Sequence, residues 1–379
     1  MSKTTLHNAI KAGGHPILLE TPAQLESASK IWRQREVLGI DTEFVRERTY
    51  RAELGLVQIS DGETAWLFDP QAISSCEPLV RMFRDSRCLK ILHSGSEDLE
   101  VLQNAVGAIP KPLVDTQIAC AMLGQSLQLG YHHALKWLFD VEIDKDQTRS
   151  NWCKRPLTER QLHYAAMDVV LLPEMLLCLK TRLEAAGRWS WLLEDVARVQ
   201  RNALSPIDPE WVYLRFSGLD RMDHDTLQTL KYLARWREHV AIEKNLARGF
   251  VIPDAALLKI ARTRPENRGQ LEEITELHPR ALARYEEPIL KNISAAARDP
   301  APVMKLEPLD NLQNRQLKQM RQIIQARAKE LEIDPALLAS RRELEKLIRA
   351  LSSGEGPPER FLGWRKEVVS DELLTVANS

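Results

Sequence analysis

The first two hundred residues alternate short apolar runs with segments whose apolar residues recur at helical spacing. Segments 21–36 and 97–107 have the helical spacing, and an Asp-Gly pair at 61–62 separates two apolar runs as in a hairpin turn. A hairpin combined with strands that are separated by helices predicts an α/β domain with a mixed sheet. Five apolar runs predict the strands: 15–20, 37–44, 54–60, 64–70 and 88–94.

Three of the predicted helices begin with a capping signal. Thr21 precedes a proline, which is favoured at the first helical position. Ser94 with Glu97, and Thr158 with Gln161, each match the capping box, in which the two side chains cap each other's backbone. The two boxes predict helices that begin directly after positions 94 and 158.

The character of the chain changes near residue 215, after which the alternation typical of strands ends. Segment 224–247 is a long amphipathic helix, and the proline-containing stretch 296–311 is typical of a linker. Segment 315–333 then opens a second helical block. The two blocks share a plan of a long basic helix followed by similar text at 256–266 and 336–346, so we interpret them as a diverged repeat.

This organisation predicts three domains. An α/β domain covers 15–205, and two all-helical domains cover 215–298 and 308–375. The net charge of the 379 residues is only −1, so overall charge does not indicate a class of partner. The five cysteines form no CxxC pair, which excludes a zinc knuckle of that kind and favours a reduced compartment. No signal peptide and no apolar run of about 20 residues stands out, so we expect a cytoplasmic protein that does not span a membrane. Nothing in the sequence demands an oligomer, so we expect a monomer.

Candidate chemistry begins at the end of the strand 37–44. Asp41 and Glu43 lie two positions apart, so both carboxylates point to the same side of the strand. Like charges at that separation raise each other's pKa unless a positive group lies between them.

Three further positions fit the same site. Asp98 falls in the first turns of the helix that follows strand 88–94, and Tyr164 and Asp168 lie four apart on one helix face. Sites in α/β sheets form where strands end and helices begin, so the four carboxylates are expected to meet. Oxygen ligands suit Mg²⁺ or Mn²⁺, and two such ions suit in-line phosphoryl displacement. The sequence therefore predicts a site for two divalent metal cations.

These residues lie in text that resembles a known family. Segments 41–44, 93–102 and 155–169 resemble the three exonuclease motifs of the DEDD superfamily, in its tyrosine branch and specifically the ribonuclease D family. Segments 44–50, 55–62 and 112–123 are also similar to that family. Segments 248–267 and 333–348 resemble its HRDC domains, and no Walker A motif accompanies them.

The resemblance implies a ribonuclease H-like exonuclease domain followed by two all-α HRDC-like domains. It implies a metal-dependent 3′-5′ exoribonuclease that releases nucleoside 5′-monophosphates from RNA with a single-stranded 3′ end, with tRNA precursors as the usual substrates. By position, Asp41, Glu43, Asp98 and Asp168 take the metal-ligand roles. Tyr164 takes the role of the group that orients the attacking water.

Several alternatives stay open at this point. His163 has the spacing of the superfamily's histidine branch, although helix geometry favours Tyr164 and an exposed histidine is the plainer interpretation. His93 either hydrogen-bonds near the site or simply ends its strand, and Gln58 is a candidate contact for the terminal nucleotide. The basic helices after 215 either bind RNA phosphates or are ion-paired surfaces.

Three rival functions remain. The same chemistry could act on DNA, and matched RNA and DNA strands would separate the two. The chain could be an inactive RNA-binding scaffold, but the complete set of four carboxylates and a tyrosine argues against that. The carboxylates could instead hold a structural cation, which predicts stabilisation by metal without nucleotide release.

Overall fold

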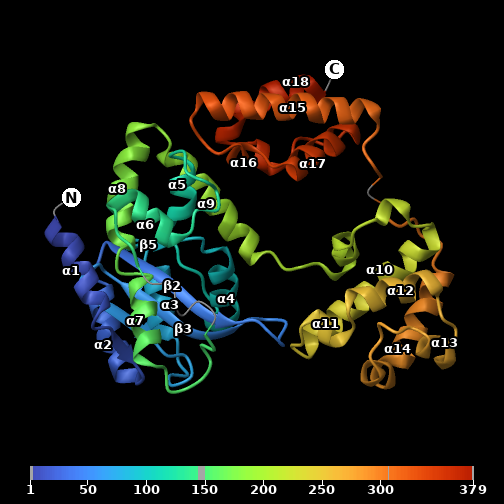
Figure 1. Ribbon diagram of the computed structural model, residues 1–379, viewed down its shortest axis with the longest axis horizontal. Helices are drawn as coiled ribbons and strands as arrows, with labels where there is room; N and C mark the ends of the chain where they lie inside the picture. The colour runs from blue at the N-terminus through green and yellow to red at the C-terminus, as the bar shows by residue number, and fades with distance from the viewer. Residues whose placement is uncertain (1–2, 144–149, 306, 378–379) are drawn as a thin grey trace. The chain divides into compact units, whose positions relative to one another are not determined.

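The computed structural model describes residues 3–143, 150–305 and 307–377 and divides into two compact units (Figure 1). The first unit comprises Met1–Val45, Leu54–Leu204 and Leu309–Ser379. The second comprises Arg46–Glu53 and Ser205–Pro308. The last helical segment therefore groups with the α/β region. Residue 306, in the predicted linker, lies outside the described residues.

A six-stranded sheet forms the centre of the first unit, in the order β1-β4-β3-β2-β5-β6. β1 and β4, β2 and β5, and β5 and β6 pair in parallel, whereas β3 and β4 pair antiparallel. The predicted mixed sheet and the hairpin around Gly62 are thus confirmed. Its strands are β1 (Ile17–Leu19), β2 (Val37–Val45), β3 (Glu53–Ser60), β4 (Ala65–Phe68), β5 (Leu89–Leu92) and β6 (Leu113–Asp115).

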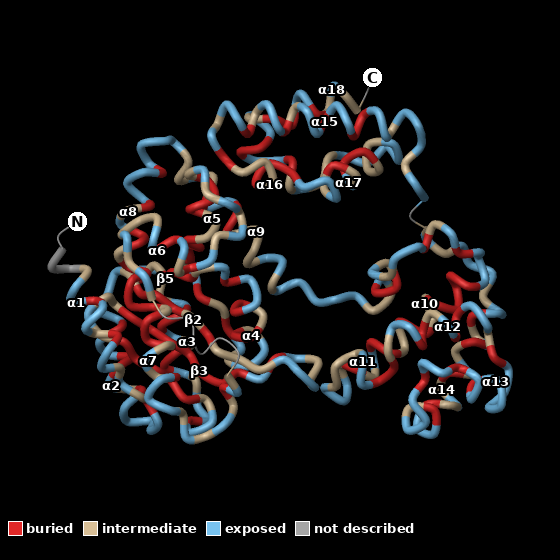
Figure 2. The backbone as a smooth tube through the Cα atoms, viewed as in Figure 1, coloured by how far each residue is buried: buried red, intermediate tan, exposed pale blue. Residues whose placement is uncertain are grey.

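Helices cover both faces of this sheet, and β4 shows how. Successive side chains of a strand point to opposite faces. Trp66 meets Trp32 of one helix edge-on, with ring centroids 6.0 Å apart, whereas Leu67 packs with Ala165 of another. Within the α/β region, buried residues accordingly gather in the sheet and in the helices against it (Figure 2). The helices of this region are α1 (Lys3–Gly13), α2 (Pro22–Trp32), α3 (Glu77–Arg84), α4 (Ser96–Val106), α5 (Thr116–Ala121), α6 (Tyr131–Phe139), α7 (Glu159–Met167), α8 (Leu172–Ala185) and α9 (Trp189–Leu204).

The capping predictions are confirmed at two helix starts and wrong at one. Thr21 and Thr158 each form a capping box. Ser94 does not, because α4 begins at Ser96 and its N-cap is Gly95 without a side-chain cap. Ser94 has φ of 63°, and the Asp115 carboxylate accepts hydrogen bonds from the backbone N–H groups of Ser94 and Gly95. An aspartate from the next strand therefore stabilises the turn that the capping box was expected to stabilise.

Gly39 lets α8 approach β2 at close range. A Cβ atom at this position would lie 2.8 Å from the Leu172 Cβ and 2.8 Å from the Val169 carbonyl oxygen. Gly39 is two residues before Asp41, and Val169 follows Asp168. The missing side chain therefore allows the segment that carries Asp168 to reach the strand that carries Asp41.

All-helical segments make up the rest of the described chain. In the second unit Tyr213 is fully buried, and its hydroxyl donates to the Met304 carbonyl at 2.9 Å. The helices of the second unit are α10 (His224–Glu243), α11 (Arg248–Val251), α12 (Asp254–Thr263), α13 (Arg268–Glu272) and α14 (Pro279–Arg298). The C-terminal helices of the first unit are α15 (Asn311–Glu330), α16 (Pro335–Leu338), α17 (Arg341–Ser352) and α18 (Asp371–Ala377).

The stretch Glu159–Ala185, 27 residues long, has the length and apolar content of a membrane span, which the sequence interpretation did not single out. It is divided between α7 and α8, and 56% of its most apolar window is buried inside the protein. Burial of this kind is ordinary for core helices, so the stretch is weak evidence for a membrane.

Candidate metal centre

Strand β2 supplies the first two carboxylates of the candidate site. Its apolar beginning is buried, with Leu38 and Ile40 fully inaccessible, so the strand is anchored in the core. Asp41 and Glu43 follow on one side of the strand and are both partly buried. The sheet thus holds two acidic side chains at a fixed position near the protein interior.

The end of α7 supplies the third carboxylate. Asp168 is the C-cap residue of this helix, and its backbone N–H donates to the Tyr164 carbonyl at 3.2 Å. The Tyr164 hydroxyl also hydrogen-bonds the Asp168 carboxylate. Tyr164 packs beside Trp152, with ring centroids 6.0 Å apart. The aromatic core therefore fixes the tyrosine that contacts the carboxylate.

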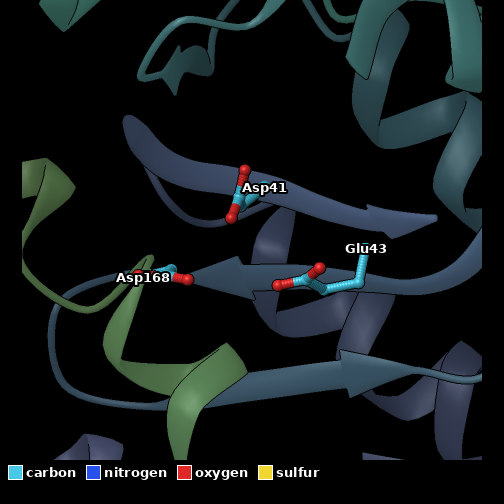
Figure 3. Close-up of side chains that lie close together, drawn as sticks. All are labelled: Asp41, Glu43 and Asp168. Carbon is cyan, nitrogen blue, oxygen red and sulfur yellow. The ribbon is translucent and has the colours of Figure 1, made fainter. Parts of the chain in front are cut away.

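The three carboxylates converge on a common space (Figure 3). Asp41, Glu43 and Asp168 each offer an oxygen, and these oxygens all lie within 4.8 Å of one another. Oxygen donors of this kind are the ligands that hard divalent cations prefer. The arrangement can therefore hold a cation from three sides.

Burial and mutual repulsion shift the acidity of these groups. Burial, and then repulsion from the neighbouring carboxylates, raises the pKa of Asp41 well above its usual range and that of Glu43 to about 9. Burial raises the pKa of Asp168 to about 7 despite the hydrogen bond from Tyr164. Burial also raises the pKa of Asp98 to about 6. A bound cation would remove the cause of the repulsion, so the residues present fit a metal.

Asp98 lies beside this group of three rather than within it. The Thr42 hydroxyl donates to its Oδ1 at 2.5 Å, and both side chains are buried. Thr42 is the residue between the two carboxylates of β2. Asp98 is nevertheless close enough for its charge to raise the pKa of Asp41 and Glu43.

Tyr131 is a neighbour of the site that sequence reasoning missed. Its hydroxyl donates to the Met167 carbonyl at 3.1 Å, directly before Asp168. Burial and the charges of Asp168 and Asp41 raise its pKa well above the usual range. The signal lay only in the tertiary contact.

His93 supports the segment that leads to Tyr131. Its Nδ1 lies 2.9 Å from the Thr116 hydroxyl and its Nε2 lies 2.9 Å from the Leu129 carbonyl. The Tyr131 ring meets the imidazole edge-on at 5.7 Å. Burial lowers the pKa of His93. The histidine therefore joins the ends of β5 and β6 to the start of α6.

The two other uncertain residues lie in different surroundings. His163 is exposed, as the plainer interpretation expected, and its Nδ1 lies 3.2 Å from the Gly13 carbonyl at the end of α1. Gln58 is fully buried on β3, and both polar atoms of its amide lack a hydrogen-bond partner among the described residues.

Many basic residues of the helical segments are ion-paired. Arg248 donates to both carboxylate oxygens of Glu238 at 2.6 Å, and Arg235 contacts Glu210 at 2.6 Å. Arg237 contacts Asp254 at 2.6 Å. These pairs favour the ion-paired interpretation at those positions.

Comparisons with known protein families match three successive regions of the chain. Residues 16–184 match the 3′-5′ exonuclease family model. Residues 226–293 match the HRDC domain, and residues 314–373 match the C-terminal HRDC domain of ribonuclease D. The described sheet and helices thus correspond to matched regions of sequence.

Whole-chain relatives agree with these matches. Ribonuclease D of Pseudomonas paraeruginosa is 37% identical, with 94% of this chain and 96% of the relative covered. Ribonuclease D of Escherichia coli is 33% identical over 94% and 96% of the two chains. A crystal structure of the Escherichia coli enzyme, described as an exoribonuclease involved in structured RNA processing, superposes with a TM-score of 0.88 at 32% identity, covering 96% of this chain and 99% of that one. The resemblance noted in the sequence is confirmed, and the chain belongs to the ribonuclease D family of 3′-5′ exoribonucleases.

Proposed function

We propose that the protein uses divalent cations, Mg²⁺ or Mn²⁺, to release nucleoside 5′-monophosphates from the single-stranded 3′ ends of RNA. The observation that carries this is the convergence of oxygens from Asp41, Glu43 and Asp168 within 4.8 Å in partly buried surroundings. The substrates we propose are structured RNAs with an unpaired 3′ tail, tRNA precursors among them. Family membership supports RNA as the partner.

The ligand set that we propose comprises Asp41, Glu43, Asp168 and Asp98. When bound, two divalent cations would lower the pKa of a water molecule and offset the charge that develops on the phosphoryl oxygens. The first three residues present their oxygens to one space. Asp98, fixed by Thr42, adds its negative charge from α4. All four roles rest on residue type and position in this chain.

Tyr164 is the residue that we propose orients the attacking water. Its hydroxyl contacts the Asp168 carboxylate, and its ring is packed in a buried cluster that includes Leu56 and Trp152. A hydroxyl held in this way keeps one direction, so it can hold a water molecule in line with the phosphorus. Tyr164→Phe is expected to lower kcat more than it raises KM.

The domain organisation that we propose keeps the bounds 15–205, 215–298 and 308–375. Supporting it are the separate helical core around α10 and the family matches within each range. In this proposal the helical domains bind structured RNA through its shape and backbone while the 3′ tail enters the exonuclease domain.

The experiment that tests the proposal is one labelled-RNA assay. An RNA with a 5′ label and an unpaired 3′ tail is incubated with the wild type and with Asp41→Asn, in Mg²⁺, in Mn²⁺ or in EDTA. We expect a ladder that shortens from the 3′ end, with nucleoside 5′-monophosphates as products, only for the wild type with metal. A DNA strand of the same sequence is the matched control for sugar preference.

Three results would contradict the proposal. A ladder that persists in EDTA would show that the reaction does not need a metal. Equal rates for the wild type and Asp41→Asn would show that the carboxylate cluster is not the active site. Retained RNA binding without any ladder in either metal would favour the inactive scaffold.

A further inference from the structure

A cavity of about 200 Å³ lies at the carboxyl ends of β5 and β6, within the first unit. Open α/β sheets commonly bind ligands at this end of their parallel strands. The carboxylate cluster described above does not line this cavity. The lining residues that bear charge or hydroxyl groups are Ser94, Ser96, Asp115, Asp195, Arg198 and Arg360.

The two acidic side chains in the lining are already neutralised or hydrogen-bonded. Asp115 accepts hydrogen bonds from the backbone N–H groups of Ser94, Gly95 and Gln117 at 2.8–3.1 Å. Asp195 accepts two hydrogen bonds from the Arg365 guanidinium, at 2.6 and 2.7 Å. Neither carboxylate therefore needs a cation from the cavity.

Of the two arginines in the lining, Arg198 is the less completely satisfied. Its Nε atom is buried and lacks a hydrogen-bond partner among the described residues. Arg198 reaches Asp195 only at 3.7 Å, which is too long for a hydrogen bond. By contrast, the Arg360 Nε pairs with Glu343 at 2.5 Å, and a terminal nitrogen of its guanidinium donates to the Leu337 carbonyl at 3.0 Å. Burial, and then repulsion from Arg365, lowers the pKa of Arg360 to about 10, although the charge of Glu343 partly offsets this shift.

The start of α4 adds hydrogen-bond donors to the lining. Helix α4 has eleven residues, and its N-cap Gly95 provides no side-chain cap. The N-terminus of a helix carries a partial positive charge and free backbone N–H groups. Ser94 and Ser96, on either side of that cap, also line the cavity and can donate hydrogen bonds from their hydroxyl groups.

We propose that this cavity binds a phosphate group. Arginine guanidinium groups, hydroxyl donors and a helix start together match the charge and the acceptor oxygens of phosphate. The volume is smaller than the roughly 300–1,000 Å³ of pockets that enclose whole drug-sized ligands, so it suits a phosphate with part of its ester. The phosphate is either a free phosphomonoester, inorganic or nucleotide, or a backbone phosphate of RNA.

Isothermal titration calorimetry on the full chain in EDTA tests this proposal. Without cations the carboxylate cluster repels phosphate, so binding is measured apart from catalysis. We expect saturable binding of inorganic phosphate and of adenosine 5′-monophosphate to the wild type. Arg198→Gln is expected to bind both about tenfold more weakly, the effect of losing one charge-assisted hydrogen bond. Failure of the nuclease assay leaves this result unaffected.

Arg201→Gln is the matched control. Arg201 lies one turn further along α9, is more exposed and pairs with Glu359, and it does not line the cavity. Its phosphate affinity should equal that of the wild type. Melting curves of both variants establish that they are folded.

A competition experiment then separates the two sources of phosphate. RNA with hydroxyl groups at both ends displaces the nucleotide if backbone phosphates enter the cavity. It leaves the nucleotide bound if the ligand is a free phosphomonoester. Absence of saturable phosphate binding to the wild type, or equal affinities for the wild type and Arg198→Gln, would overturn the proposal.

Discussion

Two buried acidic sites in the first unit are organised in opposite ways. At the carboxylate cluster, burial raises the pKa of Asp168 to about 7, and further carboxylates lie within 4.8 Å. Burial alone would raise the pKa of Asp195 as well. The hydrogen bonds and positive charge of Arg365 instead hold the pKa of Asp195 below its usual range.

The difference separates a buried ion pair that stabilises the structure from a carboxylate cluster that we propose serves chemistry. Asp195 and Arg365 are both almost fully buried and complete each other, and the Trp364 indole donates to Asp195 at 3.4 Å. Asp41 and Glu43 have raised pKa values because they are buried and, in addition, because like charges surround them. A cluster of that kind is unfavourable without a cation, and such perturbed groups are concentrated at functional sites.

Asp41→Asn is expected to have the largest effect on activity. The variant removes a proposed metal ligand, which is worth several kcal/mol of transition-state stabilisation, so the rate should fall by about a thousandfold or more. Its melting temperature in EDTA should be equal to or above that of the wild type, because one repulsive charge is gone. A pronounced loss of stability would show that Asp41 has a structural role. Single-turnover kinetics and thermal melts make the two measurements.

Asp195→Asn is expected to have the opposite effect. Removing one partner of a buried ion pair leaves Arg365 without its counter-charge, which typically costs about 3–5 kcal/mol. Denaturant unfolding of the two variants side by side measures the contrast. Equal stability changes for Asp195→Asn and Asp41→Asn would show that the two acidic sites contribute to stability in the same way.

Gly39→Ala is expected to loosen the cluster by separating its supports. The new Cβ would meet Leu172 and the Val169 carbonyl at 2.8 Å, and overpacking of this kind costs about 1–3 kcal/mol. Asp168 should then move away from Asp41, and Mn²⁺ should bind more weakly. Gly356→Ala is the control, because nothing lies within 4 Å of a Cβ there. Mn²⁺ affinity, measured by electron paramagnetic resonance, distinguishes them.

The two acidic sites also predict a pH dependence. In EDTA the folded cluster holds protons that the unfolded chain has released, since the pKa of Glu43 is about 9 and that of Asp168 about 7. Stability should therefore fall as pH rises from 6 to 9, by up to about 1.4 kcal/mol per pH unit for each proton. The lowered pKa of Asp195 adds no slope in this range.

Thermal melts in EDTA and in Mg²⁺ measure that slope. Mg²⁺ should flatten the slope, because a bound cation lowers the pKa values of the carboxylates, which then stay ionised across this pH range. Asp168→Asn should flatten it in EDTA, because one of the titrating groups is gone. An identical slope for the wild type and Asp168→Asn would show that the cluster does not titrate in this range.

Most of the fold could be predicted because its signals are local. The apolar run at β2 and the capping box at Thr158 depend on neighbouring residues only, and both are present in the structure. The Ser94 capping box failed because the Asp115 carboxylate, 21 residues away, stabilises that turn instead. A contact over such a distance leaves no periodic pattern in the chain.

In the candidate site, too, the features with local signals could be predicted and the long-range contacts could not. Asp41 and Glu43 are recognisable because a strand places alternate residues on one side, and Tyr164 and Asp168 because a helix does so at four residues. The hydrogen bond from Thr42 to Asp98 could not be foreseen, since it joins two segments 56 residues apart. The hydrogen bond from the Tyr131 hydroxyl to the Met167 carbonyl could not be foreseen either, because it too joins segments far apart in the sequence.

Tyr131→Phe is expected to have the smallest and most specific effect. Deleting the hydroxyl leaves the Met167 carbonyl without that donor, at a cost of about 1 kcal/mol in stability. Tyr213→Phe deletes a comparable tyrosine-to-carbonyl hydrogen bond, to Met304 in the other unit, which is only partly buried and should cost a similar amount or less. Only Tyr131→Phe should weaken Mn²⁺ binding, by about tenfold, because Met167 precedes Asp168 and outer-sphere contacts tune metal affinity. Equal Mn²⁺ affinities in the two variants would show that the Tyr131 hydroxyl contributes to stability but not to metal binding.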